Sequence, residues 1–391
     1  MSARSTASPG GLAPTLGVLG GGQLGRMFVH AAQTLGFRTV VLDPDASSPA
    51  GAASDEHLCA AYLDPAALAE LAARCDAVTT EFENVPAAAL AQLAARRPVS
   101  PSAAAVSVCQ HRAREKAHFA RAGVPCAPHL VLEHNDDLAG VDPALLPGIL
   151  KTSSLGYDGK GQAGVETVAE LAAGWEALHR VPCVLERRVP LQLELSVIVA
   201  RSASGECVHL PVQQNLHRAG VLALTQVPAP DVPAAAAAQA VAHARSITES
   251  LDYVGVLCVE FFLLRDGSLL ANEMAPRPHN SGHYSIDACD LSQFDLQVRT
   301  TAGLPLVAPR LHSPAVMLNL LGDLWFDAGG AERSPDWAAV LALPGVHLHL
   351  YGKAEARPGR KMGHLTVTAV GAEAALAVAR QAAAALGIAA F

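Results

Sequence analysis

Short apolar runs and amphipathic segments alternate over the first hundred residues of the chain. The runs TLGVL at 15–19 and RTVVLD at 38–43 have the length and composition of buried strands. Between them, apolar residues recur at helical spacing from Leu24 to Leu35, and Gly36 follows as a C-terminal cap. This order of strand, turn, helix and strand predicts a βαβ unit with a parallel sheet.

Similar patterns predict alternating elements in the next part of the chain. An apolar run with a polar end, at 76–85, predicts a strand, and the alanine-rich segment 87–96 predicts a helix. A proline-marked connection then leads into a helix that ends at Gly123. The first α/β unit is therefore expected to finish near residue 105.

Strand patterns prevail in the remainder. The segment 148–162 predicts a strand that leads into a glycine-rich turn, and 183–202 predicts two strands broken at Pro190. The segment 251–284 predicts a hairpin and a long loop, and 347–367 predicts strand-like segments around a basic turn.

The hairpin carries two acidic residues whose register can be predicted. Asp266-Gly267 between two apolar runs favours a two-residue turn, which places Arg265 opposite Ser268. Counting outward along both strands, Glu260 then lies directly opposite Glu273, with Cβ atoms about 5 Å apart.

Two carboxylates that close together repel one another unless a cation compensates them. Glu260 also lies within the apolar run GVLCVEFFLL, where an acid needs a partner. A hard divalent cation fits this pattern, because Mg²⁺ takes one or two carboxylates together with substrate phosphates. The alternative is a pair of solvated glutamates at the end of a sheet.

A stiff polar loop follows the second glutamate. Pro276 and Pro278 restrict the backbone, so that Arg277, His279 and Asn280 are displayed in a fixed arrangement. A guanidinium, an imidazole and an amide beside a metal pair predict a site for a small anion. A polar surface loop is the alternative.

Two glycine-rich loops are candidates for phosphate binding. The segment 20–25 fits the G-x-G-x-x-G pattern, and Asp43 stands where a ribose-binding acid would lie in a dinucleotide fold. A tight turn or a site for another phosphate remains open for this loop. The second loop, 156–161, follows Lys151 and lacks the ending of a Walker A motif, so it predicts either a phosphate lid or a plain loop.

Basic residues gather near the C-terminus, in the segment YGKAEARPGRKMGH. Lys353, Arg357, Arg360 and Lys361 lie within a few residues of one another in an acidic protein. They predict a phosphate clamp or a solvated basic turn.

Composition narrows the class of protein. The chain has 391 residues, a net charge of -8 and 16% charged residues, which argues against nucleic-acid binding. Its eight cysteines form no C-x-x-C pair, as expected for reduced thiols in the cytoplasm. No apolar run reaches the length of a membrane span, and the first residues predict a disordered tail rather than a signal peptide.

In this order, these motifs resemble the ATP-grasp superfamily and, within it, the N5-carboxyaminoimidazole ribonucleotide synthetase family. The resemblance covers residue 15 to about residue 365. The motifs that carry it are GVLGGGQLGRM, TTEFENV, LKTSSLGYDGKGQ, ELSVIVARS, NEMAPRPHNSGHY, NLLGD and LYGKAEARPGRKMGH.

The resemblance implies an α/β protein with an ATP-grasp fold, an N-terminal Rossmann-like (pre-ATP-grasp) domain and a small C-terminal β-rich unit. The expected divisions are a tail at 1–14, the N-terminal domain at 15–105, the lid domain at 106–190, the central domain at 191–310 and a C-terminal unit at 311–391 packed on the central domain.

The implied activity is ATP-dependent carboxylation of 5-aminoimidazole ribonucleotide with bicarbonate, in de novo purine biosynthesis. The products are N5-carboxyaminoimidazole ribonucleotide, ADP and phosphate, formed through carboxyphosphate. The resemblance implies ATP as co-substrate, Mg²⁺ as cofactor, and neither NAD nor biotin. It also implies a cytoplasmic homodimer that has no nucleic-acid or membrane partner.

The resemblance also implies a role for individual residues. Bicarbonate and carboxyphosphate chemistry falls to Arg277, His279, Asn280 and Lys151, and Mg²⁺ binding falls to Glu260 and Glu273. ATP would contact Arg112, Lys151, Gly156, Tyr157, Asp158, Gly159, Lys160, Gly161, Glu186, Arg187, Arg188, Val189, Glu194, His217, Asn272 and Glu273. The ribotide would contact Gly22, Gln23, Leu24, Glu83, Asn84, Tyr157, Asp158, Lys353 and Arg360, with its 5′-phosphate in the loop 20–25.

The sequence departs from the family pattern at His111, Leu155 and Lys160, where the family commonly has Asp, Gly and Arg. The last change keeps the charge but loses the planar fork of a guanidinium. Three other classes remain as alternatives: a Rossmann oxidoreductase, a silent nucleotide-binding regulator, and a formate- or biotin-dependent ATP-grasp ligase. A Mg²⁺ hairpin is unexplained by the oxidoreductase, and the intact glutamate pair speaks against the regulator.

Overall fold

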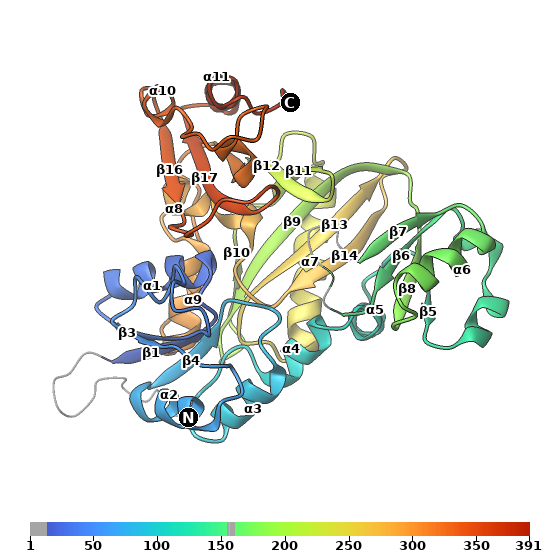
Figure 1. Cartoon of the computed structure of the whole chain (residues 1–391), viewed down its shortest axis with the longest axis horizontal. Coiled ribbons are helices and arrows are strands. Elements are labelled where there is room, and N and C mark those ends of the chain that lie inside the picture. The colour runs from blue at the N-terminus through green and yellow to red at the C-terminus, as the bar shows by residue number, and fades with distance from the viewer. Residues whose placement is uncertain (1–13, 155, 157–160) are drawn as a thin grey trace.

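The computed structural model describes residues 14–154, 156 and 161–391. Most of the predicted tail therefore lies outside the described residues, as do Leu155, Tyr157, Asp158, Gly159 and Lys160. The described chain forms an N-terminal parallel sheet, a small antiparallel sheet and a large sheet between them (Figure 1). The architecture is the predicted α/β class.

The N-terminal sheet has the strand order β3-β2-β1-β4, and its pairs are parallel. The predicted βαβ unit is confirmed, since β1 and β2 pair with Thr15 opposite Arg38 and α1 connects them. Its elements are β1 (Thr15–Leu19), α1 (Gln23–Thr34), β2 (Arg38–Leu42), β3 (Glu56–Leu58), α2 (Pro65–Arg74), β4 (Ala77–Thr80) and α3 (Ala87–Ala94). The carboxyl ends of β1 and β4 meet at one edge, where the first glycine loop lies.

Two helices connect this domain to the rest of the molecule. α5 (Arg112–Arg121) ends just before Gly123, which has φ +69°, as predicted. The segment predicted as a mere connection contains a further helix, α4 (Ala103–Cys109). His111 has extended backbone between the two helices, and the Arg112 amide donates to Ser153 O at 2.8 Å. The break thus ties the start of α5 to the end of a strand of the small sheet.

The small sheet has the order β5-β8-β6-β7 and is antiparallel throughout. Its elements are β5 (His129–Leu132), β6 (Gly148–Thr152), β7 (Gln162–Val165), α6 (Val168–Ala177) and β8 (Cys183–Arg187), with short 3-10 turns at Asn135–Gly140 and Pro143–Leu145. Trp175 of α6 is buried, and its indole donates to Val181 O at 2.8 Å. In Figure 1 this unit, coloured green, extends to one side of the large sheet.

The large sheet has the main order β14-β13-β9-β11-β12-β15-β17-β16, with β10 added beside β9. Its strands are β9 (Leu191–Arg201), β10 (Cys207–His209), β11 (Gln213–Arg218), β12 (Val221–Val227), β13 (Gly255–Leu264), β14 (Leu269–Ala275), β15 (Ala315–Leu321), β16 (Val346–Leu350) and β17 (Lys361–Thr368). Its helices are α7 (Ala234–Ser250), α8 (Ser285–Ala288), α9 (Gln293–Ala302), α10 (Trp337–Leu341) and α11 (Ala372–Leu386), with 3-10 turns at Asn280–Gly282 and Gly322–Trp325. The C-terminal strands therefore continue the sheet of the central strands.

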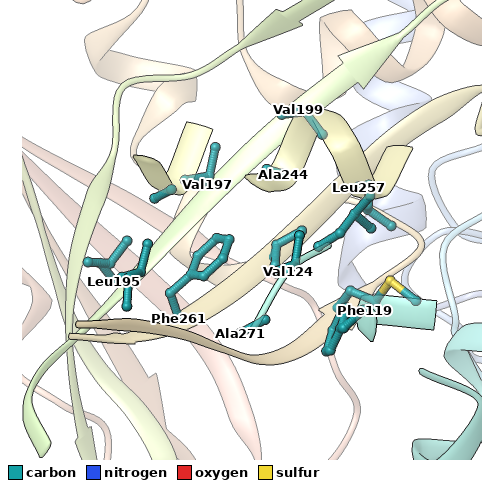
Figure 2. Packing of buried hydrophobic residues seen from close by; sticks show 14 of the residues in the cluster. Phe119, Val124, Leu195, Val197, Val199, Ala244, Leu257, Phe261 and Ala271 are labelled. Carbon is teal, nitrogen blue, oxygen red and sulfur yellow. The ribbon is translucent and has the colours of Figure 1, made fainter. Parts of the chain in front are cut away.

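Both faces of the central strands are buried, and this explains their unbroken apolar runs. On β9, Leu195, Val197 and Val199 pack under α5 and α7 with Phe261 of β13, as Figure 2 shows. The intervening Ile198 belongs to a second core on the other face. Among the described residues, no helix is long and apolar enough to span a membrane.

The buried middle and the exposed start of β9 allow a matched stability test. Leu195 is fully buried whereas Leu191, at the start of the same strand, is 37% exposed. Leu195→Ala should lower the free energy of unfolding by roughly 2–5 kcal/mol, since it leaves a cavity. Leu191→Ala should cost less than about 1 kcal/mol. Chemical denaturation followed by circular dichroism measures both, and equal losses would contradict this assignment of the core.

Candidate active site

A cavity of about 790 Å³ opens between the N-terminal sheet, the proline-rich loop and the C-terminal basic turn. It brings together predicted residues that are far apart in the sequence. Those on its wall are Gly22, Gln23, Leu24, Glu83, Asn84, Arg112, Gly156, Glu273, Arg277, His279, Asn280, Lys353 and Arg360.

Other predicted residues of the ATP and metal sites lie outside this wall. Lys151 and Glu186 are buried on β6 and β8 of the small sheet. Arg187 and Arg188 are exposed at the end of β8, and Arg188 pairs with Glu166 at 3.0 Å. The wall of this cavity also lacks six further predicted residues: Gly161, Val189, Glu194, His217, Glu260 and Asn272.

The acidic hairpin has the predicted pair but not the predicted turn. Glu260 lies opposite Glu273, as expected. The two-residue turn is wrong, because the Leu264 amide bonds Ser268 O at 2.9 Å and Leu263, not Leu264, pairs with Leu269. Gly267, with φ +83°, supplies the extra left-handed residue of a three-residue turn.

A bulge restores the register further along the hairpin. The pairing shifts between Phe261 and Glu260, so that Asn272 is the extra residue on β14. The bulge and the longer turn compensate one another, and the two carboxylates meet. The side-chain Oδ1 of Asn272 and Oε1 of Glu260 are buried without a hydrogen-bond partner in the described chain.

The two carboxylates have opposite pKa shifts. Burial and the charge of Glu273 raise the pKa of Glu260 to about 7. Burial also acts to raise the pKa of Glu273, but Arg112 and Lys151 outweigh it and lower that pKa. The Arg112 guanidinium lies 3.2 Å from the Glu273 carboxylate. Two carboxylates that repel one another, beside buried oxygens without hydrogen-bond partners, fit a hard divalent cation.

Polar side chains continue this site across the neighbouring strands. Glu260 lies opposite Ser196 of β9, and Glu194 lies opposite Asn215 of β11, so these side chains share one face of the sheet. The His217 imidazole contacts the Glu194 carboxylate. Burial lowers the pKa of His217, but hydrogen bonding to Glu194 outweighs it and the pKa is raised.

Two functional candidates on α5 were missed by sequence reasoning. Lys116 is fully buried, and its ammonium donates to Asn272 O at 2.8 Å and lies 3.3 Å from the Glu186 carboxylate. Glu115 is also buried and accepts the Met274 amide at 2.6 Å, while burial raises its pKa to about 8. The sequence contained a signal for both, since residues three and four positions after Arg112 lie on the same face of a helix.

Glu186 is the centre of a buried ion cluster between the small and large sheets. Its carboxylate lies 3.1 Å from Lys151 as well as 3.3 Å from Lys116. Burial alone would raise the pKa of Glu186, but the two ammonium groups lower it to about 2. Burial lowers the pKa of Lys151. The cluster therefore carries more cationic than anionic groups beside the acidic hairpin.

The proline-rich loop is held by hydrogen bonds from several elements. Arg277 donates to the Glu83 carboxylate at 2.6 Å and to Pro278 O at 3.0 Å. The His279 amide donates to Gln293 Oε1 at 2.8 Å, and burial together with Arg277 holds the pKa of His279 well below its usual range. Asn280 is buried, and its Nδ2 lacks a partner within the described chain.

The first glycine loop donates its amides to carboxylates of the chain itself. Gly22 and Gly25 donate to Glu81 at 2.8 and 3.1 Å, and Gly21 donates to Asp43 at 2.6 Å. Asp43 thus holds the glycine loop of its own chain through the Gly21 amide. The neighbouring Gln23 and Leu24 remain on the cavity wall.

The basic turn reaches the same cavity from the C-terminal strands. Lys353 donates to Lys361 O at 2.7 Å, and Arg360 donates to Glu355 O at 2.8 Å. Both contacts are to backbone oxygens, and they orient the two side chains. The turn thus brings Lys353 and Arg360 to the cavity wall.

A separate group of Asp287, His349 and His364 has metal-binding residue types but not a converging geometry. Its donor atoms all lie within 4.8 Å of one another. The two imidazole rings stack at 4.4 Å with an angle of 11°, so one ion cannot lie in both ring planes. His349 instead bonds Asp287 at 2.8 Å, and the group is a hydrogen-bonded stack.

A small antiparallel sheet beside a large one, with buried lysine and paired glutamates at their junction, defines an ATP-grasp ligase. Residues 117–294 match the family described as ATP-grasp domain. Residues 13–110 match the ribonucleotide synthetase preATP-grasp domain, and residues 315–378 match the phosphoribosylaminoimidazole carboxylase C-terminal domain.

Full-length relatives agree with these matches. N5-carboxyaminoimidazole ribonucleotide synthase of Brucella melitensis is 45% identical over 356 residues, covering 90% of this chain and 95% of the relative. The Bacillus subtilis enzyme of that name is 39% identical over 352 residues, covering 90% of each. The chain belongs to the N5-carboxyaminoimidazole ribonucleotide synthase family.

Solved structures show the same similarity. The synthetase from Thermus thermophilus is 39% identical, with a TM-score of 0.86 over 96% of this chain and 99% of that one. The synthase from Aspergillus clavatus, in complex with ADP and 5-aminoimidazole ribonucleotide, is 34% identical, with a TM-score of 0.87 and the same coverage. The predicted fold and family are thereby confirmed.

The contribution of the buried cluster around Glu186 to the free energy of unfolding can be tested. Lys116→Met should lower the free energy of unfolding by roughly 2–4 kcal/mol, because Glu186 loses one of two cations in a buried site. Arg188→Met removes a cation from the exposed pair with Glu166 and should cost at most about 1 kcal/mol. Chemical denaturation of both variants decides between these values, and a neutral Lys116→Met would contradict the assigned role.

Proposed function

We propose that this chain catalyses ATP-dependent carboxylation of 5-aminoimidazole ribonucleotide by bicarbonate. The products are N5-carboxyaminoimidazole ribonucleotide, ADP and phosphate, as in de novo purine biosynthesis. The observation that carries the proposal is the single cavity on which the acidic hairpin, the anion loop and the basic turn converge. The names of the relatives support the same reaction.

ATP binds between the small and the large sheet in this proposal. Its adenine lies along the end of β8, residues 186–189, and Glu194 and His217 lie toward its ribose. Arg112 and Lys151 contact the phosphates, with the loop 156–161 folded over them. Arg112 already donates to Gly156 O at 3.5 Å, which holds the start of that loop near Glu273. The roles of Tyr157, Asp158, Gly159 and Lys160 remain predictions from the sequence.

Glu260 and Glu273 would hold Mg²⁺, and Asn272 adds an amide oxygen beside them. When bound, the ion would neutralise phosphate charge during transfer. The residues of this chain fit such an ion because their oxygens are partly buried and lack enough donors. The surrounding cations of Arg112 and Lys151 complement the γ-phosphate itself.

Bicarbonate lies beside Arg277, His279 and Asn280. A bicarbonate oxygen attacks the γ-phosphorus, and the bond to the bridging oxygen of ADP breaks. The ribotide 5-amino group then attacks the carboxyl carbon, phosphate leaves, and the amine loses one proton. Closure of the site must exclude water, because carboxyphosphate hydrolyses readily.

The ribotide occupies the other end of the cavity. Contacts from the N-terminal domain come from Gly22, Gln23, Leu24, Glu83 and Asn84, and Lys353 and Arg360 contact its phosphate from the C-terminal strands. Glu83 holds Arg277 and so joins the ribotide site to the bicarbonate site. Family resemblance further supports a cytoplasmic homodimer and the domain boundaries expected from the sequence.

The direct test supplies ATP, labelled bicarbonate and 5-aminoimidazole ribonucleotide to the purified protein. We expect one ADP for each acid-labile label fixed on the ribotide. Glu273→Gln should abolish ATP cleavage and leave the fold intact, because it removes one metal ligand and also relieves repulsion from Glu260. A Glu273→Gln variant with near-normal turnover at low Mg²⁺ would disprove the metal assignment, whereas unlabelled ribotide with wild-type protein would disprove the function.

The basic turn separates the ribotide site from the ATP site. Arg360→Ala removes a charge-assisted contact worth roughly 1.5–3 kcal/mol, or about one to two decades in affinity. The KM for the ribotide should rise accordingly, and the KM for ATP should not. A two-substrate kinetic series on wild type and variant measures both constants.

The dephosphorylated riboside is the matched control substrate for Arg360. It should be a poor substrate for the wild type, and Arg360→Ala should hardly worsen it. If the variant loses riboside and ribotide turnover equally, Arg360 is not a phosphate ligand.

A further inference from the structure

Glu81, at the carboxyl end of β4, is a buried carboxylate that the proposed reaction does not use. It is 6% exposed and accepts the amides of Gly22 and Gly25 at 2.8 and 3.1 Å. Both donors belong to the glycine loop at the start of α1. A carboxyl side chain of the chain itself therefore takes the loop amides to which the sequence analysis assigned the 5′-phosphate of the ribotide.

The glycines of the loop leave room for this carboxylate. A Cβ at Gly20 would lie 2.6 Å from Glu81 Oε1, one at Gly22 would lie 2.9 Å from the same atom, and one at Gly25 would lie 3.0 Å from Glu81 Cγ. Gly22 has φ −74°, which any residue can adopt. At Gly22, contact with Glu81 is thus the steric reason for a glycine.

The start of α1 supplies both backbone amides that bind Glu81 and residues that line the cavity. The first amides of a helix have no acceptor within it and carry partial positive charge. Glu81 takes the amide of Gly25, while Gln23 and Leu24 lie on the cavity wall. Glu81 is itself a wall residue, so one carboxylate both holds the loop amides and reaches the cavity beside Gln23 and Leu24.

We propose that Glu81 is the internal anion of the glycine loop and a positioning residue for the ribotide. It fixes the start of α1 so that Gln23 and Leu24 face the ribotide, and it closes the loop to a second phosphate such as that of a dinucleotide. The ribotide part rests on the proposed function, whereas the internal anion does not.

Stability measurements test the internal anion without any activity assay. Glu81→Ala leaves an anion-sized hole beside two amides, so it should lower Tm, and added formate should restore part of the loss while chloride at equal ionic strength should not. Gly22→Ala should lower Tm in the wild type but less than half as much in Glu81→Ala.

Gly21→Ala is the matched control for that cycle, because a Cβ at Gly21 meets Ser48 and Asp43 instead of Glu81. Its effect should be the same with and without Glu81. An unchanged effect of Gly22→Ala in the Glu81→Ala background, or no response to formate, would overturn the internal anion.

Kinetics test the positioning role. Glu81→Ala should raise the ribotide KM about tenfold or more, as for loss of one well-placed contact, with the ATP KM and bicarbonate-dependent ATP hydrolysis within about twofold. Formate should lower the ribotide KM again. Asp55→Asn is a control within the same domain, since Asp55 accepts the Thr39 amide at 2.8 Å and lies off the cavity wall.

A second variant covers the case in which Glu81→Ala does not fold. Glu81→Gln keeps the shape but turns a donor toward one of the two amides, so it should raise the ribotide KM without a response to formate. A wild-type ribotide KM for Glu81→Gln would contradict the positioning role. If the wild type fixes no bicarbonate, the proposed function fails, and the Tm measurements still decide whether Glu81 is the internal anion.

Discussion

The repulsion between Glu260 and Glu273 governs the arrangement of the site. Two carboxylates opposite one another on a hairpin require cations, and the chain supplies them from several directions. Arg112 comes from α5 and Lys151 from the small sheet, both close enough to lower the pKa of Glu273. The pKa of Glu260 remains raised, which leaves the pair short of positive charge. In the proposed function, a metal ion and the phosphates of ATP would supply the missing compensation when they bind.

The same electrostatics tie the two sheets together. Glu186 belongs to the small sheet, whereas Lys116 belongs to a helix packed on the large one. Lys116 also holds the backbone oxygen of Asn272, the residue of the bulge between the two glutamates. A shift of the small sheet therefore acts on the hairpin through one fully buried ammonium group. The position of the small sheet is thereby coupled physically to Glu260 and Glu273.

Sequence reasoning found the βαβ unit, the central strands and the glutamate pair, because periodicity and turn residues act locally. It missed what depends on contacts distant along the chain. The hairpin prediction was correct for Glu260 and Glu273 although its turn was wrong, since the bulge at Asn272 compensates for the longer turn. Glu81 lay within a recognised motif, but only the folded loop shows that it fills the space left by glycines. Buried Lys116 was concealed in a polar helix.

The C-terminal strands do more than carry the basic turn. β15 pairs directly with β12, and β17 and β16 follow it in the same sheet. Leu224 of β12 packs with Val316, Leu365 and residues of α11 in one core. A chain cut before β15 would thus end in an open edge strand with unpaired amides and an uncovered apolar face, which is a template for aggregation. The C-terminal strands therefore protect the edge of β12 and belong to the same folding unit as the central strands.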